Sequence, residues 1–168
     1  DFVAVGRSGT ILTSSDGITW TSRTSGTCNL LEDIAYGGSI YVAVGRNNCG
    51  GGMTSIVTSP DGISWTSRSS GTSNNLKGVA YGNGQFVAVN DYGERLTSTD
   101  GIDWTLGSGG GLSVTYGNGQ FVTGSTDLIF ANGLFVMVGQ NGSISTSSDG
   151  TDWTSRTSGT EASLMAIT

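Results

Sequence analysis

The chain has 168 residues and a formal net charge of −6, and only 12% of its residues are charged. This length suffices for one domain with its own core, so we predict a single domain over residues 1–168. The acidic balance argues against a nucleic-acid partner, and the lack of a long apolar run argues against membrane insertion.

The first residues, Asp1–Gly6, lack the basic, apolar and small-residue layout of a signal peptide, and the chain does not begin with Met. We therefore expect a processed or excised part of a larger chain or assembly.

A nine-residue segment, Thr13–Thr21, is the first of four copies that together contain all of the tryptophans. Each copy carries Ser, then Asp-Gly, then Trp. The Asp and Trp residues are Asp16 and Trp20, Asp61 and Trp65, Asp100 and Trp104, and Asp149 and Trp153. They recur at intervals of roughly 40 to 50 residues, which suits one four-stranded propeller blade.

The unit that follows the second copy shows the expected strands most clearly. Asn83-Gly84 is a two-residue hairpin signal, because a type I′ turn needs positive φ at both central positions. β-branched and aromatic residues dominate the runs around it. The four predicted strands are 76–81, 85–89, 95–98 and 102–105.

The second strand of this unit recurs along the chain as an almost continuously apolar run. Such runs are typical of inner strands packed on both faces, here between neighbouring blades. The copies are 2–6, 41–45, 86–90 and 135–139, with a weaker one at 121–124.

The interval between Phe121 and Phe135 breaks the pattern, because no third and fourth strands and no Asp-Gly-Trp segment lie in it. Either this blade is degenerate, or about 25 residues have been lost between Gly124 and Leu128 relative to the repeat; we favour a loss. The count then predicts an all-β propeller with five blades, four with a complete signature and one partial. A four-bladed ring is the alternative.

The two ends of the chain match each other. The chain begins in a second strand, and Leu164–Thr168 resembles the first strand at Leu31–Ala35. We therefore expect the terminal strands to pair, which closes the ring and removes free sheet edges.

Cys28 lies in a link between blades, and Cys49 lies in the extended loop 46–52 of the next blade. Both connections emerge on the same face of an up-and-down meander, so we predict a disulfide, with two free buried thiols as the alternative. A disulfide implies an oxidising compartment, and hence a secreted or cell-surface protein.

The signature resembles the Asp-box, the bacterial-neuraminidase-type repeat S-x-D-x-G-x-T-W, although Gly here follows Asp directly and the turn is one residue shorter. The matching residues of the first copy are Ser14, Asp16, Gly17 and Trp20. The resemblance implies a structural hairpin between the third and fourth strands. Asp can accept hydrogen bonds from its own turn, and Trp can anchor it.

No residue stands out as catalytic, and no metal or cofactor is expected. The Asp residues occur once per blade, whereas a catalytic group is needed once, and no D-x-D-x-D run offers a calcium site. The chain has no His, the commonest general base. Arg23, Arg68 and Arg156 follow the repeat, so we interpret them as structural donors rather than as a sialidase cluster.

Ligand contacts are instead expected in loops that differ between blades, although these loops can also be read as solvated turns. The candidates are Asn47, Asn48, Asn90, Asp91, Tyr92 and Glu94. The leading hypothesis is a non-catalytic, lectin-like module that binds glycans between blades with avidity. The alternatives are a structural or protein-interaction module of a surface appendage, fibre or adhesin, and a sialidase-like glycoside hydrolase.

Overall fold

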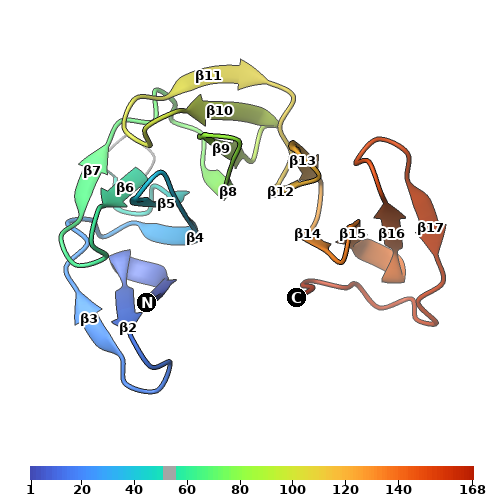
Figure 1. The fold of residues 1–168 in the computed structure, drawn as a ribbon, viewed down its shortest axis with the longest axis horizontal. Helices are drawn as coiled ribbons and strands as arrows, with labels where there is room; N and C mark the ends of the chain where they lie inside the picture. The colour runs from blue at the N-terminus through green and yellow to red at the C-terminus, as the bar shows by residue number, and fades with distance from the viewer. Residues whose placement is uncertain (51–55) are drawn as a thin grey trace.

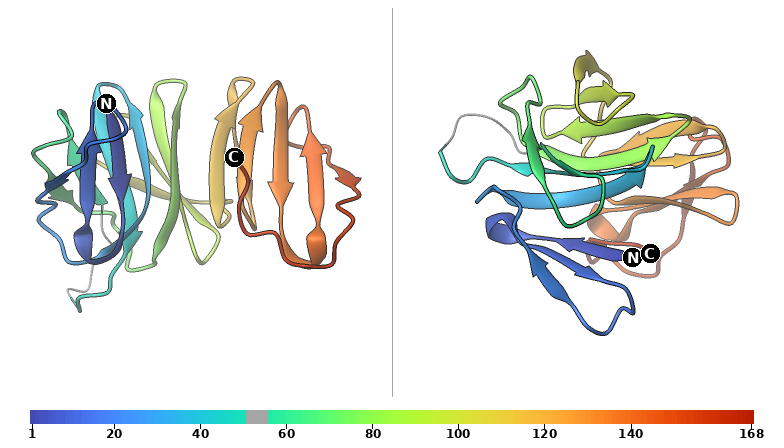
Figure 2. Two further views of the ribbon diagram at one scale, coloured as in Figure 1. Left: turned by 90° about the horizontal axis from the view of Figure 1, so that it is seen from below. Right: turned by 60° about the vertical axis from the view of Figure 1, so that its left-hand side comes forward.

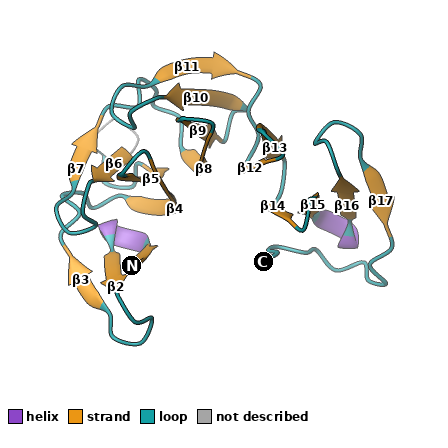
Figure 3. Ribbon diagram, viewed as in Figure 1, coloured by secondary structure: helices purple, strands orange, loops and turns teal. Residues whose placement is uncertain are grey.

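The computed structural model describes residues 1–50 and 56–168. Strands and turns make up almost all of this part of the chain, with two single-turn 3-10 helices, η1 (Arg7–Gly9) and η2 (Gln140–Gly142) (Figure 3). Neither helix is long and apolar enough to cross a membrane. The prediction of an all-β fold is confirmed.

Five antiparallel sheets follow one another along the chain, with three, four, four, two and four strands. The first sheet holds β1 (Phe2–Val5), β2 (Ile11–Ser14) and β3 (Thr21–Arg23). The second holds β4 (Leu30–Gly37), β5 (Ile40–Arg46), β6 (Ile56–Ser59) and β7 (Thr66–Arg68). The third holds β8 (Leu76–Gly82), β9 (Gln85–Asn90), β10 (Glu94–Ser98) and β11 (Thr105–Ser108). The fourth holds β12 (Ser113–Gly117) and β13 (Gln120–Gly124), and the fifth holds β14 (Leu128–Ala131), β15 (Leu134–Val138), β16 (Ile144–Ser147) and β17 (Thr154–Arg156).

The sheets are arranged as blades along an arc. The first strands β4, β8, β12 and β14 face the inside of the arc, and β3, β7, β11 and β17 form its outer rim (Figure 1). Seen from the side, the inner strands run side by side from one end of the molecule to the other (Figure 2). Because each sheet is a meander, the turns between its first and second strands and between its third and fourth strands lie at one end. The turn between its second and third strands lies at the other end, together with the links between sheets.

The predicted hairpin turns are present. Asn83 and Gly84 have φ of 48° and 77°, and the equivalent Asn118 and Gly119 have φ of 48° and 80°. These left-handed values are those that a type I′ turn requires, and Asn and Gly tolerate them best. The Asn-Gly pairs therefore fix the register of the inner two strands.

The core lies between neighbouring sheets. Val42 and Ile56 of the second sheet pack with Phe86 and Leu96 of the third in one buried cluster. At the hairpin ends the contact is closer still, because a Cβ at Gly37, Gly82 or Gly117 would overlap the aromatic ring of the next sheet. Each sheet thus needs a neighbour to bury its face.

The fourth strands begin later than the sequence predicts. In the third sheet Ile102, Asp103 and Trp104 belong to the turn, and β11 begins at Thr105. The reason is the Asp turn itself, whose backbone N–H groups at Ile102 and Asp103 donate to Asp100 instead of to a neighbouring strand.

The predicted pairing of the terminal strands is not formed in this structure. The first sheet contains only β1, β2 and β3, and residues 164–168 are not in a strand. Leu164 instead donates its backbone N–H to the carbonyl of Gly139, beside the last sheet. A closed five-bladed ring therefore stays a prediction.

Candidate functional site

The four Asp-Gly-Trp segments fold into four turns with the same hydrogen bonds. In the first, Oδ1 of Asp16 accepts from the backbone N–H groups of Ile18 (2.8 Å) and Thr19 (2.7 Å) and from the Ser14 hydroxyl (2.9 Å). Nε1 of Trp20 donates to the carbonyl of Gly17 at 3.3 Å. The same bonds recur around Asp61, Asp100 and Asp149.

These bonds stabilise the ionised carboxylates. The N–H groups of Thr19 and Ile18, and then the Ser14 hydroxyl, lower the pKa of Asp16 from 3.8 to about 2. The pKa values of Asp61, Asp100 and Asp149 are lowered by the equivalent donors. An Asp whose Oδ1 already accepts three hydrogen bonds suits a fixed turn better than proton transfer.

The turns also contact the neighbouring sheet. A Cβ built on Gly101 would lie 2.8 Å from Cγ2 of Val42, in the second sheet. Gly62 also faces the first sheet, where a Cβ would make an ordinary contact with Val3 at 3.8 Å. At Gly101 only Gly permits so close an approach while also taking positive φ, so this turn positions the third sheet against the second.

The repeated arginines bond within their own sheets. Nε of Arg23 donates to Oγ1 of Thr13 at 2.8 Å, and Arg68 and Arg156 make the same bond to Thr58 and Thr146. This geometry accounts for an Arg after each W-T-S without a ligand.

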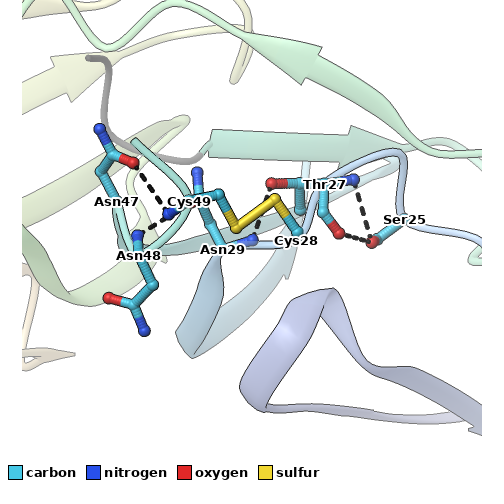
Figure 4. Close-up of a disulfide and its surroundings, with 7 residues drawn as sticks. All are labelled: Ser25, Thr27, Cys28, Asn29, Asn47, Asn48 and Cys49. Atoms are coloured by element: carbon cyan, nitrogen blue, oxygen red, sulfur yellow. Dashed lines mark hydrogen bonds between the residues drawn. A yellow bond between two sulfur atoms is a disulfide. The ribbon is translucent and has the colours of Figure 1, made fainter. Parts of the chain in front are cut away.

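Cys28 and Cys49 are joined by a disulfide with Cα atoms 6.1 Å apart (Figure 4). The prediction that these cysteines can pair is confirmed. The Asn29 side chain supports the same loop, since its Oδ1 accepts from the backbone N–H groups of Asn48 (3.0 Å) and Cys49 (3.2 Å). Asn47 and Asn48 lie beside the disulfide, whereas residues 51 and 52 of the predicted loop lie outside the described residues.

The polar groups of the loop Asn90–Glu94 form hydrogen bonds with one another instead of all facing outward toward a ligand. Asn90 is fully buried, and its Oδ1 accepts from the backbone N–H groups of Tyr92 and Glu94 at 3.0 Å each. The Asn90 amide donates to Glu94 at 2.6 Å and thereby lowers the pKa of Glu94, helped by Asn74. Asn75 donates to Asp91 in the same loop, and Tyr92 is exposed.

A hollow of about 870 Å³, which we call the axial cavity, lies inside the arc. Its walls come from the inner strands of the second to fifth sheets and from the C-terminal segment. Four of its lining residues occupy one repeat position, three residues before an inner-strand aromatic: Asp33, Gly78, Ser113 and Asp127.

The two aspartates at this position accept hydrogen bonds from the backbone of the next inner segment. Oδ2 of Asp33 accepts from the backbone N–H of Val79 at 2.8 Å, and Oδ2 of Asp127 accepts from that of Ile167 at 2.9 Å. Burial raises the pKa of Asp33 despite the N–H donors, and the charges of Asp127 and Glu32 act in the same direction. Nearby, Lys77 pairs with Glu32 at 3.5 Å.

This cavity is the site that the sequence alone does not predict. Its signal is a difference within the repeat: Asp, Gly and Ser occupy the same inner-strand position in different sheets, whereas the signature turns hardly vary. Within residues 1–50 and 56–168, no group of three or more His, Cys, Asp or Glu side chains is placed to hold a metal ion.

Antiparallel meanders arranged along an arc, with packed faces between them, define a β-propeller-like fold. No family model and no curated protein matches the chain. Among solved structures, the chain is similar to YCF48 bound to D1 peptide, with 19% identity and a TM-score of 0.62 over 99% of this chain and 53% of that one. It thus spans about half the length of that chain.

Two weaker similarities accompany it. One is YCF48 from Cyanidioschyzon merolae, with 16% identity and a TM-score of 0.41 over 76% of this chain and 37% of that one. The other is a structure from the GH130 family of mannoside phosphorylases, with 13% identity and a TM-score of 0.35 over 96% and 61% of the two chains.

Proposed function

We propose that this chain is a non-catalytic binding module that holds a segment of a partner protein in the axial cavity. The observation that carries the proposal is the variation of the cavity wall. Residue types differ there from sheet to sheet, whereas the four Asp turns repeat the same bonds, as do Arg23, Arg68 and Arg156 in their own sheets. The YCF48 structure similar to this chain holds a D1 peptide, which is consistent with a peptide ligand for the fold.

The chemistry of the wall favours a peptide. Leu112, Leu164 and Met165 supply apolar surface, while Asp127 and Lys77 supply charges of both signs. A polypeptide offers the same mixture of apolar side chains, charges and backbone groups. The described lining contains no aromatic ring on which a sugar could stack.

Two leucines of equal exposure allow a matched test. Leu112 lines the cavity and Leu106 lies on the outer strand β11, and both are 45% exposed. We would probe a random-peptide phage library with the wild type, enrich binders, and measure their affinity for the Leu112→Arg and Leu106→Arg variants.

We expect Leu112→Arg to weaken the selected peptides by tenfold or more, which corresponds to about 1.4 kcal/mol, and Leu106→Arg to leave them unchanged. Equal binding to both variants, or no enrichment over unrelated protein, contradicts a peptide site in this cavity.

A glycan is the second candidate, and one groove favours it. This groove, of about 710 Å³, lies beside the disulfide and is lined by side chains rich in hydroxyl and amide groups, among them Ser8, Thr10, Ser22 and Asn29. A glycan array tests it: binding that is lost in a Ser22→Arg variant and retained in Leu112→Arg places a sugar in the groove.

The remaining proposals concern chemistry and location. We propose that the turns are shortened Asp-boxes with a structural role. We also propose that the chain does not catalyse a reaction, since the arginines and tyrosines of the described chain do not line the axial cavity. Release of the fluorophore from a fluorogenic sialoside would overturn the proposal that the chain is not an enzyme.

The disulfide supports an extracytoplasmic location, which alkylation and mass spectrometry of Cys28 and Cys49 from the native source would test.

A further inference from the structure

The fourth sheet stops after two strands although complete sheets lie on both sides of it. The third and fifth sheets continue outward with a third and a fourth strand, whereas the fourth sheet consists of β12 and β13 alone. Among the described strands, β13 therefore pairs along one edge only, with β12. The strands β10 and β11 on one side, and β16 and β17 on the other, lie farther out on the arc (Figure 1).

The hairpin at Asn118-Gly119 determines which backbone groups point to the outer edge of β13. The residues that flank a two-residue turn, here Gly117 and Gln120, bond to each other, and the following residues alternate between the two edges of the strand. The N–H and C=O groups of Phe121 and Thr123 therefore point away from β12. No strand within residues 1–50 or 56–168 pairs with them there.

Both faces of β13 are packed, which holds this edge in strand geometry. Phe121 packs against the buried cluster that contains Val87 of the third sheet and Val114 of β12. Val122 lies in another buried cluster, with Phe135 of the fifth sheet. A strand that is already ordered loses little conformational freedom when a ligand pairs with it.

The edge also lacks the side chains that usually prevent strands from adding to a sheet. Charged residues and Pro commonly block an exposed edge, and Gln120–Gly124 contains neither. By contrast, the outermost strands β3, β7 and β17 each end in Arg. The edge of β13 is thus open to another strand both in its backbone and in its side chains.

The other sheets show which kind of strand fits beside a second strand. In each of them the third strand ends in Thr-Ser, with the Ser opposite an aromatic residue. These pairs are Phe2 and Ser14, Tyr41 and Ser59, Phe86 and Ser98, and Phe135 and Ser147. In the third sheet Leu96 is fully buried opposite Ala88. The equivalent positions of β13 call for a small residue opposite Phe121 and an apolar residue opposite Thr123.

We propose that the outer edge of β13 binds an extended segment of a partner protein, antiparallel to β13, in which an apolar residue is followed by Thr-Ser. Main-chain hydrogen bonds to Phe121 and Thr123 supply affinity, and the two side-chain positions supply selectivity. This site differs from the axial cavity, which residues of β12 line and residues of β13 do not. A slim extended segment suits the edge better than a second folded copy, because the neighbouring outer strands lie farther out on both sides (Figure 1).

Amide exchange measured by NMR on the wild-type chain tests this proposal. The probe is an end-capped peptide with the sequence of β10, Glu94–Ser98, at millimolar concentration. The matched control is the same peptide with Leu96→Pro, which lacks the N–H group that would donate to the carbonyl of Thr123. The amides of Phe86 and Ala88, which occupy the same positions in β9 and face β10, are the internal reference.

We expect the amides of Phe121 and Thr123 to exchange at least tenfold faster than those of Phe86 and Ala88 in the free protein. The β10 peptide should slow both by tenfold or more, and the Leu96→Pro peptide should not. Slow exchange at both amides without peptide, no effect of either peptide, or equal effects of the two overturns the proposal. Protection that increases with protein concentration alone also overturns it, because the edge then binds a second copy.

Discussion

The strands β1 and β9 contain the same four residues, Phe-Val-Ala-Val, yet they have different surroundings. Phe86–Val89 is completely buried, with sheets on both of its faces, whereas Phe2 is exposed and the other three residues of β1 are half-buried. The same local sequence therefore makes the same strand in both places. Its burial, and most of its contribution to stability, depend on whether a neighbouring sheet is present.

Truncating the shared Phe in each strand gives the largest expected effect. We expect Phe86→Ala to lower the free energy of unfolding by about 3 to 5 kcal/mol, because it leaves a cavity in a packed core. Phe2→Ala should cost less than about 1 kcal/mol, since its ring already faces solvent. Urea denaturation measures both. Equal losses would contradict the assignment of the open face to the first sheet.

The disulfide joins the link after the first sheet to a loop of the second sheet. Cys28 and Cys49 are separated by 21 residues, and opening a loop of that length costs about 3 kcal/mol in the chain-entropy account. We expect the double Cys→Ser variant to lose about 2 to 4 kcal/mol, measured by the same denaturation. Reduction of the wild type with dithiothreitol should give the same loss and leave the variant unaffected.

Ala substitutions at the equivalent turn glycines Gly17 and Gly101 compare the first and third sheets at a single position. Gly17 and Gly101 both have positive φ, 73° and 75°, so Ala costs about 1 to 2 kcal/mol of strain at either. At Gly101 the new Cβ also meets Val42 of the neighbouring sheet, whereas at Gly17 the nearest atom is 3.7 Å away on Phe2. We expect Gly101→Ala to be more destabilising by about 1 to 3 kcal/mol. An equal loss of unfolding free energy in Gly17→Ala would show that the backbone strain of the turn alone determines the destabilisation.

The repeat predicts the blades because local signals agree within it. Asn-Gly turns, apolar strands and Asp turns each specify the same meander, so the all-β class and most strand positions follow from the sequence. The predicted fourth strands begin too early, because Ile102 and Trp104 look like strand residues. Only their hydrogen bonds, from Ile102 to Asp100 and from Trp104 to the carbonyl of Gly101, show that they belong to a turn. The two-stranded fourth sheet agrees with the missing signature between Phe121 and Phe135.

The candidate site was harder to predict for a physical reason. A cavity inside an arc is formed by residues from four sheets, and neither Asp33 nor Asp127 has a neighbour in sequence that marks it. Asn90 and Glu94 are loop candidates because they are polar and lie in a loop that occurs once, but polar side chains in a tight loop can form hydrogen bonds with one another, as these do. A polar residue that occurs in only one repeat therefore indicates a ligand site only when its side chain is also known to be accessible.

The smallest expected effect is a pH dependence of opposite sign at two aspartates. Burial raises the pKa of Asp33, so just above pH 3.8 the folded protein keeps a proton that the unfolded chain has released. The contribution of Asp33 to the free energy of unfolding therefore falls as pH rises from 3.8 through the folded pKa. Backbone donors lower the pKa of Asp16 to about 2, so its stabilisation is present above pH 3.8 and is lost as pH falls from 3.8 to about 2. The two effects are separated by melting temperatures of the wild type, Asp33→Asn and Asp16→Asn from about pH 2 to 7.

Asp33→Asn should flatten the curve of melting temperature against pH above pH 3.8, and Asp16→Asn should flatten it below pH 3.8. An Asp33→Asn curve parallel to that of the wild type would mean that the axial carboxylate is solvated like the turns on the rim, and that the axial cavity differs from them in shape alone.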